Sequence, residues 1–204
     1  MTKLYLIRHG QSEWNQLNKV QGQTNTNLTD LGKKQAQMLG NKLISKNIER
    51  IYTSDLNRAK DTATAISKKI NKPLLSSEFL REIKFGSWEG LTILEIQDRY
   101  KEQYLMWNKN PDKLNLDGAE TLQIVKDRVM NWIKPIIEEN KGKSIAIVSH
   151  GTTLKVLMLG LLGIPLSYYK NFTISNVGLS IVECRDYNNV LTKLNDISHL
   201  EGLL

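Results

Sequence analysis

The chain has 204 residues, of which 40% are hydrophobic and 24% are charged, a composition typical of a globular protein with one domain. Its net charge of +7 comes from scattered basic residues that are not interleaved with aromatic side chains, which argues against a nucleic-acid groove. The longest apolar stretch, 156–166, is shorter than the ~20 residues that cross a bilayer, and the N-terminus lacks the apolar region of a signal peptide. We therefore expect a cytoplasmic protein with no nucleic-acid or membrane partner, present as a monomer or homodimer.

The first 70 residues alternate between strand and helix patterns. In chain order these are a strand at 4–7, a helix from Thr29 to about Lys46, a strand at 50–53 and a helix at 56–70. Threonine is a favourable N-cap residue, and the apolar residues of both predicted helices recur every three or four positions. The alternation is typical of an α/β layered domain.

The stretch from about Ile83 to Asn115 is less regular and richer in aromatic residues. We expect a helical, cap-like insertion around 83–118, carried by a single domain that covers residues 1–204. The alternation then resumes with a helix at 122–136 kinked at Pro135, a strand at 144–149, a helix at 151–162, and two strands at 178–184 and 189–194 joined by a turn. These elements predict a three-layer α/β/α sandwich with a mostly parallel sheet and one antiparallel edge strand.

Two predicted strands end in the same way. Residues 4–10 and 145–151 each consist of an apolar run, one polar residue and then His-Gly. In an open α/β sheet, ligands bind beyond the carboxyl ends of the strands near a topological switch point. If the two strands are neighbours in the sheet, His9 and His150 lie in one crevice.

The residues around His9 favour phosphate binding. Arg8 offers a planar fork of donors that matches phosphate geometry, and Gly10 allows a close backbone approach to a ligand. Ser12 and Asn15 supply neutral donors, as do the first amides of a helix that starts there. A phosphoryl group that is transferred to a neutral imidazole nitrogen needs such a cradle, because its charge is spread over three oxygens.

The segment 6–15, Leu-Ile-Arg-His-Gly-Gln-Ser-Glu-Trp-Asn, resembles the signature of the histidine phosphatase superfamily, also called phosphoglycerate-mutase-like. Further segments resemble that family in the same order along the chain: 21–22 with 27–32, 53–59 with Thr62, 80–83 with 85–90, 118–121 and 148–151. The resemblance covers nearly the whole chain and implies the fold of that family. Several ordered motifs are far more specific than a single Arg-His-Gly.

The resemblance implies a role for each site residue. His9 is expected to attack phosphorus, Glu82 to protonate the leaving oxygen, and three side chains to surround the phosphoryl oxygens: Arg8, Arg58 and His150. The expected substrate-binding residues are Ser12, Asn15, Gln21, Gly22, Gly151 and Thr152. Two alternatives remain open from the residues alone. In the first, Arg58 lies on the surface and forms an ion pair with Asp61 or Asp55. In the second, Glu82 forms an ion pair with Arg81 or Lys84.

We expect no metal and no other cofactor. None of the three histidines pairs at ligand spacing with a carboxylate or a cysteine. The only cysteine, Cys184, lies in an apolar stretch and is expected in the core. Two arginines and a second histidine supply the charge neutralisation that a cation would otherwise give.

The family contains phosphatases and mutases that share this site. The segment 85–90, Phe-Gly-Ser-Trp-Glu-Gly, is similar to the broad-specificity phosphatases, and residues 101–115 lack the arginine pair of the mutases. We therefore expect a phosphomonoester hydrolase that acts on small phosphorylated metabolites through a phosphohistidine intermediate. The alternative is a cofactor-dependent phosphoglycerate mutase. A non-catalytic protein that binds a phospho-ligand or nucleic acid is a distant third.

The C-terminal segment 194–200 follows the last predicted strand. Its simplest interpretation is a packed or disordered tail. The alternative is a tail that folds over the mouth of the crevice, where His199 would hold the part of the substrate remote from phosphorus. The resemblance to family members that act on carboxylate-bearing phosphates favours phosphoserine or 3-phosphoglycerate in that case.

Overall fold

The computed structural model describes residues 1–203; Leu204, the last residue of the predicted domain, lies outside the described residues. It contains one six-stranded sheet in the order β3-β2-β4-β1-β5-β6. The strands are β1 (Thr2–Arg8), β2 (Ile48–Ser54), β3 (Leu74–Ser77), β4 (Ser144–Ser149), β5 (Leu179–Cys184) and β6 (Asn189–Asp196). The α-helices are α1 (Glu13–Gln16), α2 (Asp30–Leu43), α3 (Asn57–Ile70), α4 (Ile93–Arg99), α5 (Lys101–Lys109), α6 (Leu122–Glu139) and α7 (Gly151–Leu162).

The sheet is mostly parallel, as the sequence predicts. Strand β1 pairs in parallel with β4, and β2 pairs in parallel with both β4 and β3. The antiparallel pairings lie at one side of the sheet, where β5 pairs with β1 and β6 pairs with β5. The reversed strand is therefore β5, and β6 covers its outer edge.

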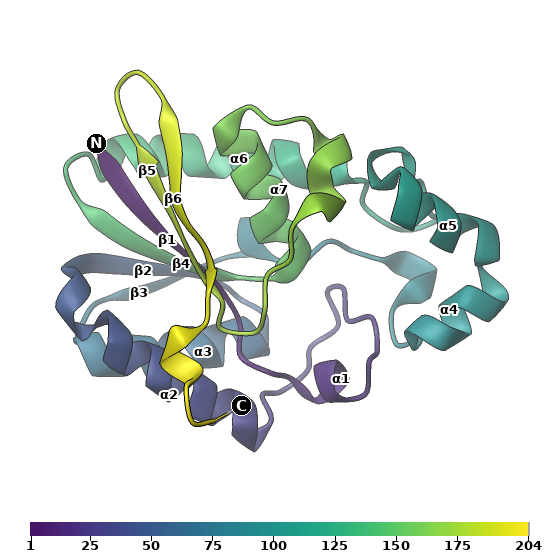
Figure 1. Cartoon of the computed structure of the whole chain (residues 1–204), viewed down its shortest axis with the longest axis horizontal. Helices are drawn as coiled ribbons and strands as arrows, with labels where there is room; N and C mark the ends of the chain where they lie inside the picture. The colour runs from purple at the N-terminus through teal and green to yellow at the C-terminus, as the bar shows by residue number, and fades with distance from the viewer. Residues whose placement is uncertain (204) are drawn as a thin grey trace.

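Helices cover both faces of the sheet, which gives the expected three layers (Figure 1). Helices α6 and α7 pack on one face, and α2 and α3 pack on the other. Strand β4 is a continuous apolar run, and its side chains contact the helices on both faces of the sheet. Ile145 and Ile147 point to the α6–α7 side, whereas Ala146 and Val148 point to the α2–α3 side, because successive side chains of a strand alternate.

A local sequence signal accounts for the start of α2. The Thr29 hydroxyl caps α2 by accepting from the Gly32 amide (3.0 Å), as predicted, but the helix ends at Leu43 and a short 3-10 turn continues to Lys46. Helix α6 continues through Pro135 to Glu139. Strand β3 was not predicted, because its four residues form a short edge strand with no alternation of apolar and polar side chains.

The segment between β3 and α6 contains α4, α5 and several 3-10 turns, and it lies to one side of the sheet in Figure 1. Its small apolar cluster is formed by Trp88, Ile96, Leu114 and Leu116. The division of the chain into one domain with an insertion around 83–118 stays a prediction. In the described part of the chain, the helices are too short or too polar to span a membrane.

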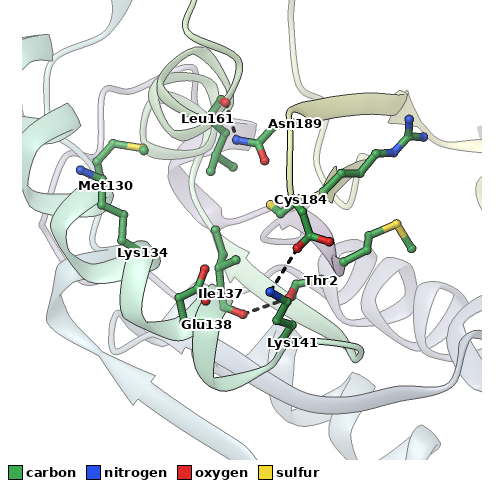
Figure 2. A pocket seen from close by; sticks show the side chains of 12 residues that line it. Thr2, Met130, Lys134, Ile137, Glu138, Lys141, Leu161, Cys184 and Asn189 are labelled. Carbon is green, nitrogen blue, oxygen red and sulfur yellow. Dashed lines mark hydrogen bonds and ion pairs between the residues drawn. The ribbon is translucent and has the colours of Figure 1, made fainter.

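A cavity of about 540 Å³ opens at the amino end of β1 (Figure 2). Cys184 lies in its wall, buried as predicted, and burial raises the pKa of its thiol to about 11. Several polar groups around the cavity already have partners: Lys141 pairs with Asp186, and the Thr2 hydroxyl donates to the Ile137 carbonyl. The cavity is at the opposite end of β1 from Arg8, about 20 Å away for a seven-residue strand.

Candidate active site

His9 and His150 lie side by side at the carboxyl ends of β1 and β4. The parallel register pairs Arg8 with Ser149, so the next residue of each strand reaches the same level of the sheet. The two imidazole ring centroids are 5.2 Å apart, and both side chains are buried, with exposed fractions of 2% and 0%. The structure thus brings together the two His-Gly segments that the sequence singles out.

The imidazole of His9 is held in one tautomer. Its Nδ1 lies 2.7 Å from the Gly10 carbonyl oxygen, which only accepts, so Nδ1 carries the hydrogen and the lone pair belongs to Nε2. Burial lowers the pKa of His9 well below 6.5, and the charges of Arg58 and Arg8 lower it further. His9 is therefore a neutral imidazole at neutral pH, which is the form that acts as a nucleophile.

The close approach at Gly10 is to the protein itself. A Cβ at this position would lie 2.6 Å from the carbonyl oxygen of Gly32 in the first turn of α2, and the Gly10 amide donates to the Thr62 hydroxyl (3.0 Å). The sequence-based interpretation, which assigned the glycine to ligand approach, missed this packing. These contacts hold Gly10, the residue after His9, against both α2 and α3.

Two buried guanidinium groups flank the histidines. Arg8 donates to the Ile174 carbonyl (2.7 Å), and Arg58 donates to the carbonyls of Gly22 (2.7 Å) and Thr24 (2.8 Å). Burial lowers the pKa of Arg58 to about 10, which leaves it charged at neutral pH. Among residues 1–203, Nε of each arginine and both ring nitrogens of His150 are buried without a hydrogen-bond partner. Such groups are costly unless an anion binds them.

The surface alternative for Arg58 is wrong. Its side chain is 0% exposed, and within the described residues it forms no ion pair with Asp55 or Asp61. Asp55 instead accepts from Arg81, whose Nε lies 2.8 Å from the carboxylate, and this contact lowers the pKa of Asp55. Arg58 is placed in the crevice because α3 starts directly after β2, the neighbour of β4.

The loop after β1 is held by its own polar side chains. The Ser12 hydroxyl donates to the side-chain oxygen of Gln21 (2.8 Å), which also accepts from the Thr26 hydroxyl (2.7 Å). The Asn15 side-chain oxygen accepts from the Ser12 amide and from Asn176, each at 3.1 Å. Asn176 also donates to the His9 carbonyl (3.0 Å), a contact that gave no signal in the sequence.

The backbone at Gly22 packs directly against the side chain of Glu89. Gly22 has a φ of +51°, and a Cβ there would overlap the Glu89 side chain. The Glu89 carboxylate accepts from the Gln23 amide (3.2 Å), the Thr24 hydroxyl (2.9 Å) and the Phe85 amide (2.9 Å). The sequence showed Glu89 only as part of a motif. In the structure it fastens the loop whose carbonyls Arg58 binds.

Glu82 lies against the amino end of α7, the helix that follows His150. Its carboxylate accepts from the amides of Thr152 and Thr153 (3.1 Å each), from the Thr153 hydroxyl (3.2 Å) and from its own neighbour Ile83 (3.0 Å). A helix N-terminus attracts negative charge. The ion-pair alternative is wrong, because across residues 1–203 no salt bridge joins Glu82 to a lysine or arginine.

Gly151 separates the carboxylate from a guanidinium. A Cβ on Gly151 would lie 3.7 Å from Arg8 Nε and 3.9 Å from Glu82 Oε2. The Thr152 hydroxyl, in the same turn, lies 2.9 Å from the hydroxyl of Tyr169. The first turn of α7 therefore borders both the cationic part of the site and Glu82.

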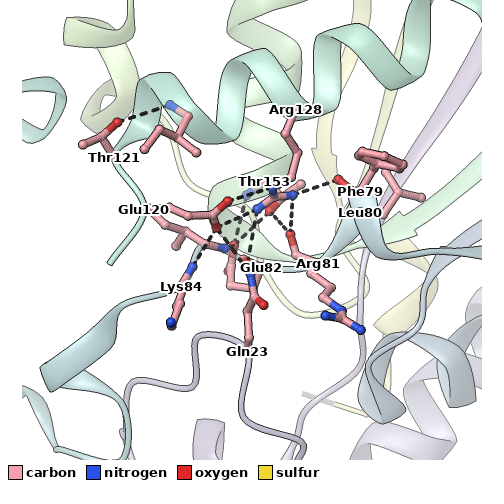
Figure 3. A network of polar contacts seen from close by, with 12 residues as sticks. Gln23, Phe79, Leu80, Arg81, Glu82, Lys84, Glu120, Thr121, Arg128 and Thr153 are labelled. Carbon is pink, nitrogen blue, oxygen red and sulfur yellow. Dashed lines mark hydrogen bonds and ion pairs between the residues drawn. The ribbon is translucent and has the colours of Figure 1, made fainter. Parts of the chain in front are cut away.

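A half-buried arginine holds the segment that carries Glu82 (Figure 3). Arg128 of α6 binds the Glu120 carboxylate through two nitrogens, each at 2.9 Å, and donates to the carbonyls of Phe79 (2.8 Å) and Arg81 (3.0 Å). Glu120 also accepts from the Lys84 amide (2.9 Å). Sequence reasoning missed Arg128, because nothing in the local pattern of α6 distinguishes it from a surface arginine.

His199 does not lie in the crevice, so the tail hypothesis is corrected. It belongs to a short 3-10 turn (Ser198–Leu200) packed on α2, where Lys42 binds Asp196 (2.8 Å) and the Ser198 hydroxyl (2.7 Å). Burial, followed by the charge of Lys42, lowers the pKa of His199 to about 4. Lys42 is ten residues along α2 from Gly32, or about 15 Å.

A metal centre has no ligand set in the part of the chain that the structure describes, since no three His, Cys, Asp or Glu side chains group to hold an ion. Positive charge at the site comes from Arg8 and Arg58. The arrangement is a neutral imidazole beside buried donors, with a carboxylate at the amino end of α7. This chemistry suits a tetrahedral dianion such as a phosphate ester.

Comparisons with known proteins agree with the fold and with the family that the sequence resembles. The family model of the histidine phosphatase superfamily (branch 1) matches residues 4–197. Phosphoserine phosphatase 1 of Hydrogenobacter thermophilus is 32% identical over 200 residues, which cover 98% of this chain and 95% of that protein. Proteins named probable phosphoglycerate mutase, from Salmonella, also match along nearly the whole chain.

Solved structures give the same result. The structure of YhfR from Bacillus stearothermophilus has a TM-score of 0.93 and 30% identity, covering 98% of this chain and all of that one. A mutant phosphoserine phosphatase from Entamoeba histolytica in complex with phosphoserine has a TM-score of 0.88 and 34% identity, with coverage of 98% and 100%. The chain belongs to the histidine phosphatase superfamily, and it is an enzyme of that family.

Proposed function

We propose that the protein is a phosphomonoester hydrolase of small phosphorylated metabolites, with His9 as the nucleophile. One observation carries the proposal: His9, whose Nδ1 contact with Gly10 leaves the Nε2 lone pair free, lies beside Arg8, Arg58 and His150, each of which has a buried side-chain nitrogen without a partner among residues 1–203. The names of the phosphoserine phosphatase relatives support hydrolysis of small phosphate esters.

In the first step, His9 Nε2 attacks phosphorus, the P–N bond forms and the ester P–O bond breaks. Glu82 gives its proton to the leaving oxygen, which departs as an alcohol. Arg8, Arg58 and His150 bind the non-bridging oxygens, whose charge they stabilise in the transition state.

In the second step, water attacks the phosphohistidine. Glu82 takes a proton from that water, the P–N bond breaks and inorganic phosphate is released, which restores neutral His9 and protonated Glu82. The donors that bind the substrate phosphate also bind the phosphoryl group in the intermediate, so one set of side chains serves both steps.

Phosphoglycerate interconversion is the second candidate function. It uses the same phosphohistidine, with a bound sugar acid in place of water as the acceptor. The segment 101–115, which contains α5, has three lysines and no arginine pair to bind the second charge of such an acceptor. This composition favours water as the acceptor.

A phosphate-release assay in excess EDTA tests the proposal. We expect release of inorganic phosphate from small esters, inhibition by vanadate, and no conversion of 3-phosphoglycerate to 2-phosphoglycerate in a parallel assay. Activity that is lost on chelation and restored by a divalent ion contradicts the mechanism. Interconversion without phosphate release identifies the mutase instead.

A further inference from the structure

Lys155 is a nearly buried lysine next to the candidate active site. It lies in the second turn of α7 and is 9% exposed. Its ammonium nitrogen is 3.8 Å from the ring centroid of Tyr169 and 5.4 Å from that of Phe172. Among residues 1–203, no carboxylate forms an ion pair with it and no acceptor binds it. Within the described part of the chain, its close contacts are with these aromatic faces.

An ammonium in this environment favours an anionic ligand. Aromatic faces attract a cation, but they compensate only part of the cost of removing an ammonium from water. Burial lowers the pKa of Lys155 to about 8, and the charge of Lys170 lowers it further, while Glu82 opposes this effect. Lys155 is still mostly charged at neutral pH, and a bound anion would restore its pKa.

Lys155 lies on the side of the site where the leaving group is expected. Thr152, one turn earlier on α7, donates its amide to Glu82 (3.1 Å), and its hydroxyl contacts that of Tyr169 (2.9 Å). Lys155 packs on the same tyrosine ring, roughly 5 Å further along the helix axis. Because Glu82 protonates the leaving oxygen in the proposed mechanism, the carbon skeleton of the substrate extends along this side of the site.

A second lysine widens the positive region. Lys170 lies in the 3-10 segment Leu166–Asn171, with its ammonium 4.6 Å from the Trp107 ring centroid and 3.2 Å from the Asn108 side-chain oxygen. It also lies 5.9 Å from the Tyr169 ring that Lys155 contacts. Two ammonium groups on one aromatic surface repel a cationic substrate end and attract an anionic one.

We propose that Lys155 binds a second anionic group of the substrate, a carboxylate on the carbon next to the ester-bearing carbon, and so makes the enzyme selective for phosphorylated hydroxy acids. The inference rests on the proposed phosphatase function. It gives Lys155 the remote contact that the sequence had assigned to His199. Such a contact orients the ester over His9 and raises kcat/KM for one substrate over another.

A matched pair of esters tests this role. 3-Phosphoglycerate and glycerol 1-phosphate share a skeleton and differ by a carboxylate in place of a hydroxymethyl group. In Lys155→Met, which keeps the length of the side chain, we expect the ratio of kcat/KM between the two esters to fall ~10- to 100-fold. Lys155→Arg should recover part of the ratio. Lys134→Met, which removes the same charge from an exposed position of α6, should leave the ratio unchanged.

A binding measurement separates this inference from the proposed function. In a His9→Ala background, calorimetry reports the affinity for both esters without turnover, and adding Lys155→Met should weaken 3-phosphoglycerate binding by a similar factor relative to glycerol 1-phosphate. An unchanged preference in both assays overturns the role of Lys155 and leaves the hydrolase intact. If the wild-type enzyme releases phosphate from neither ester, the proposed function fails, and the calorimetric preference alone decides whether Lys155 binds the carboxylate.

Discussion

His9 and His150 occupy equivalent positions at the ends of two adjacent parallel strands, and their ring centroids lie 5.2 Å apart. Only His9 has a ring nitrogen bound to the protein, through its Nδ1 contact with Gly10. The two rings therefore differ in what they can do. The fixed tautomer of His9 leaves its Nε2 lone pair free for the nucleophilic attack that we propose, and the ring of His150, which has no partner among residues 1–203, is available to bind a phosphoryl oxygen.

This difference predicts covalent catalysis on His9. His9→Ala should lower kcat by roughly 10³-fold or more, because the nucleophile is removed. Acid-quenched mass spectrometry of the wild type should find an acid-labile phosphate on His9 during turnover. His199→Ala is the matched control and should keep wild-type activity, since the 3-10 turn that carries His199 packs on α2, away from the crevice. Wild-type turnover in His9→Ala contradicts the mechanism.

Glu82 is expected to matter most for poor leaving groups. Glu82→Gln keeps the size of the side chain but removes the transferable proton, so kcat/KM for an alkyl ester such as glycerol 1-phosphate should fall ~10²- to 10³-fold. p-Nitrophenyl phosphate has a leaving group that departs without a proton and should lose much less. Equal losses on both esters would show that Glu82 serves binding alone.

Arg128 is predicted to act through Glu82. Arg128→Met removes the donors to the Phe79 and Arg81 carbonyls, which frees the segment that carries Glu82. We expect ~10-fold lower kcat, with larger losses on alkyl than on aryl esters, the same signature as Glu82→Gln. The double variant Arg128→Met/Glu120→Gln controls for the stability lost when Glu120 is left unpaired. A uniform loss on both esters in the double variant argues for a purely structural role.

The buried histidines predict a stability that falls with acid. Burial, then the charge of Arg58, lowers the pKa values of His9 and His150 well below 6.5 in the folded protein. Below pH 6.5 the unfolded chain therefore binds more protons than the folded one, and unfolding becomes more favourable as pH falls. The urea midpoint should decrease as the pH falls from 6.5 to 5, a window in which few other groups titrate.

His199→Gln tests how much of this loss of stability in acid comes from His199. It removes one group whose pKa is lowered to about 4, so the decrease of the urea midpoint between pH 6.5 and pH 5 should become shallower. A midpoint that does not change with pH in this window, in either protein, would mean that the histidines are not held neutral by the fold.

Local sequence predicted five of the six strands in the described residues and marked His9 as the candidate nucleophile. Alternation of side chains placed Ile145 and Ile147 on one face of β4, and the hydroxyl of Thr29 specified the start of α2. Arg8, His9 and Gly10 are consecutive, so a short pattern was enough to mark them. In each case the signal and its structural consequence lie within a few residues, where period, capping and backbone freedom act.

Tertiary structure alone decided which distant groups meet. Arg58 binds carbonyls 34 and 36 positions earlier in the chain, and Arg128 reaches back 47 and 49 positions to the segment around Glu82. In the sequence, Lys155 is a single lysine within an apolar helix. Its ammonium faces aromatic rings only after α7 packs on the segment around Tyr169. The tail was misplaced for the same reason: Leu200 buries its side chain with Leu39 and Leu43 of α2, and that apolar surface exists only once the helix has formed.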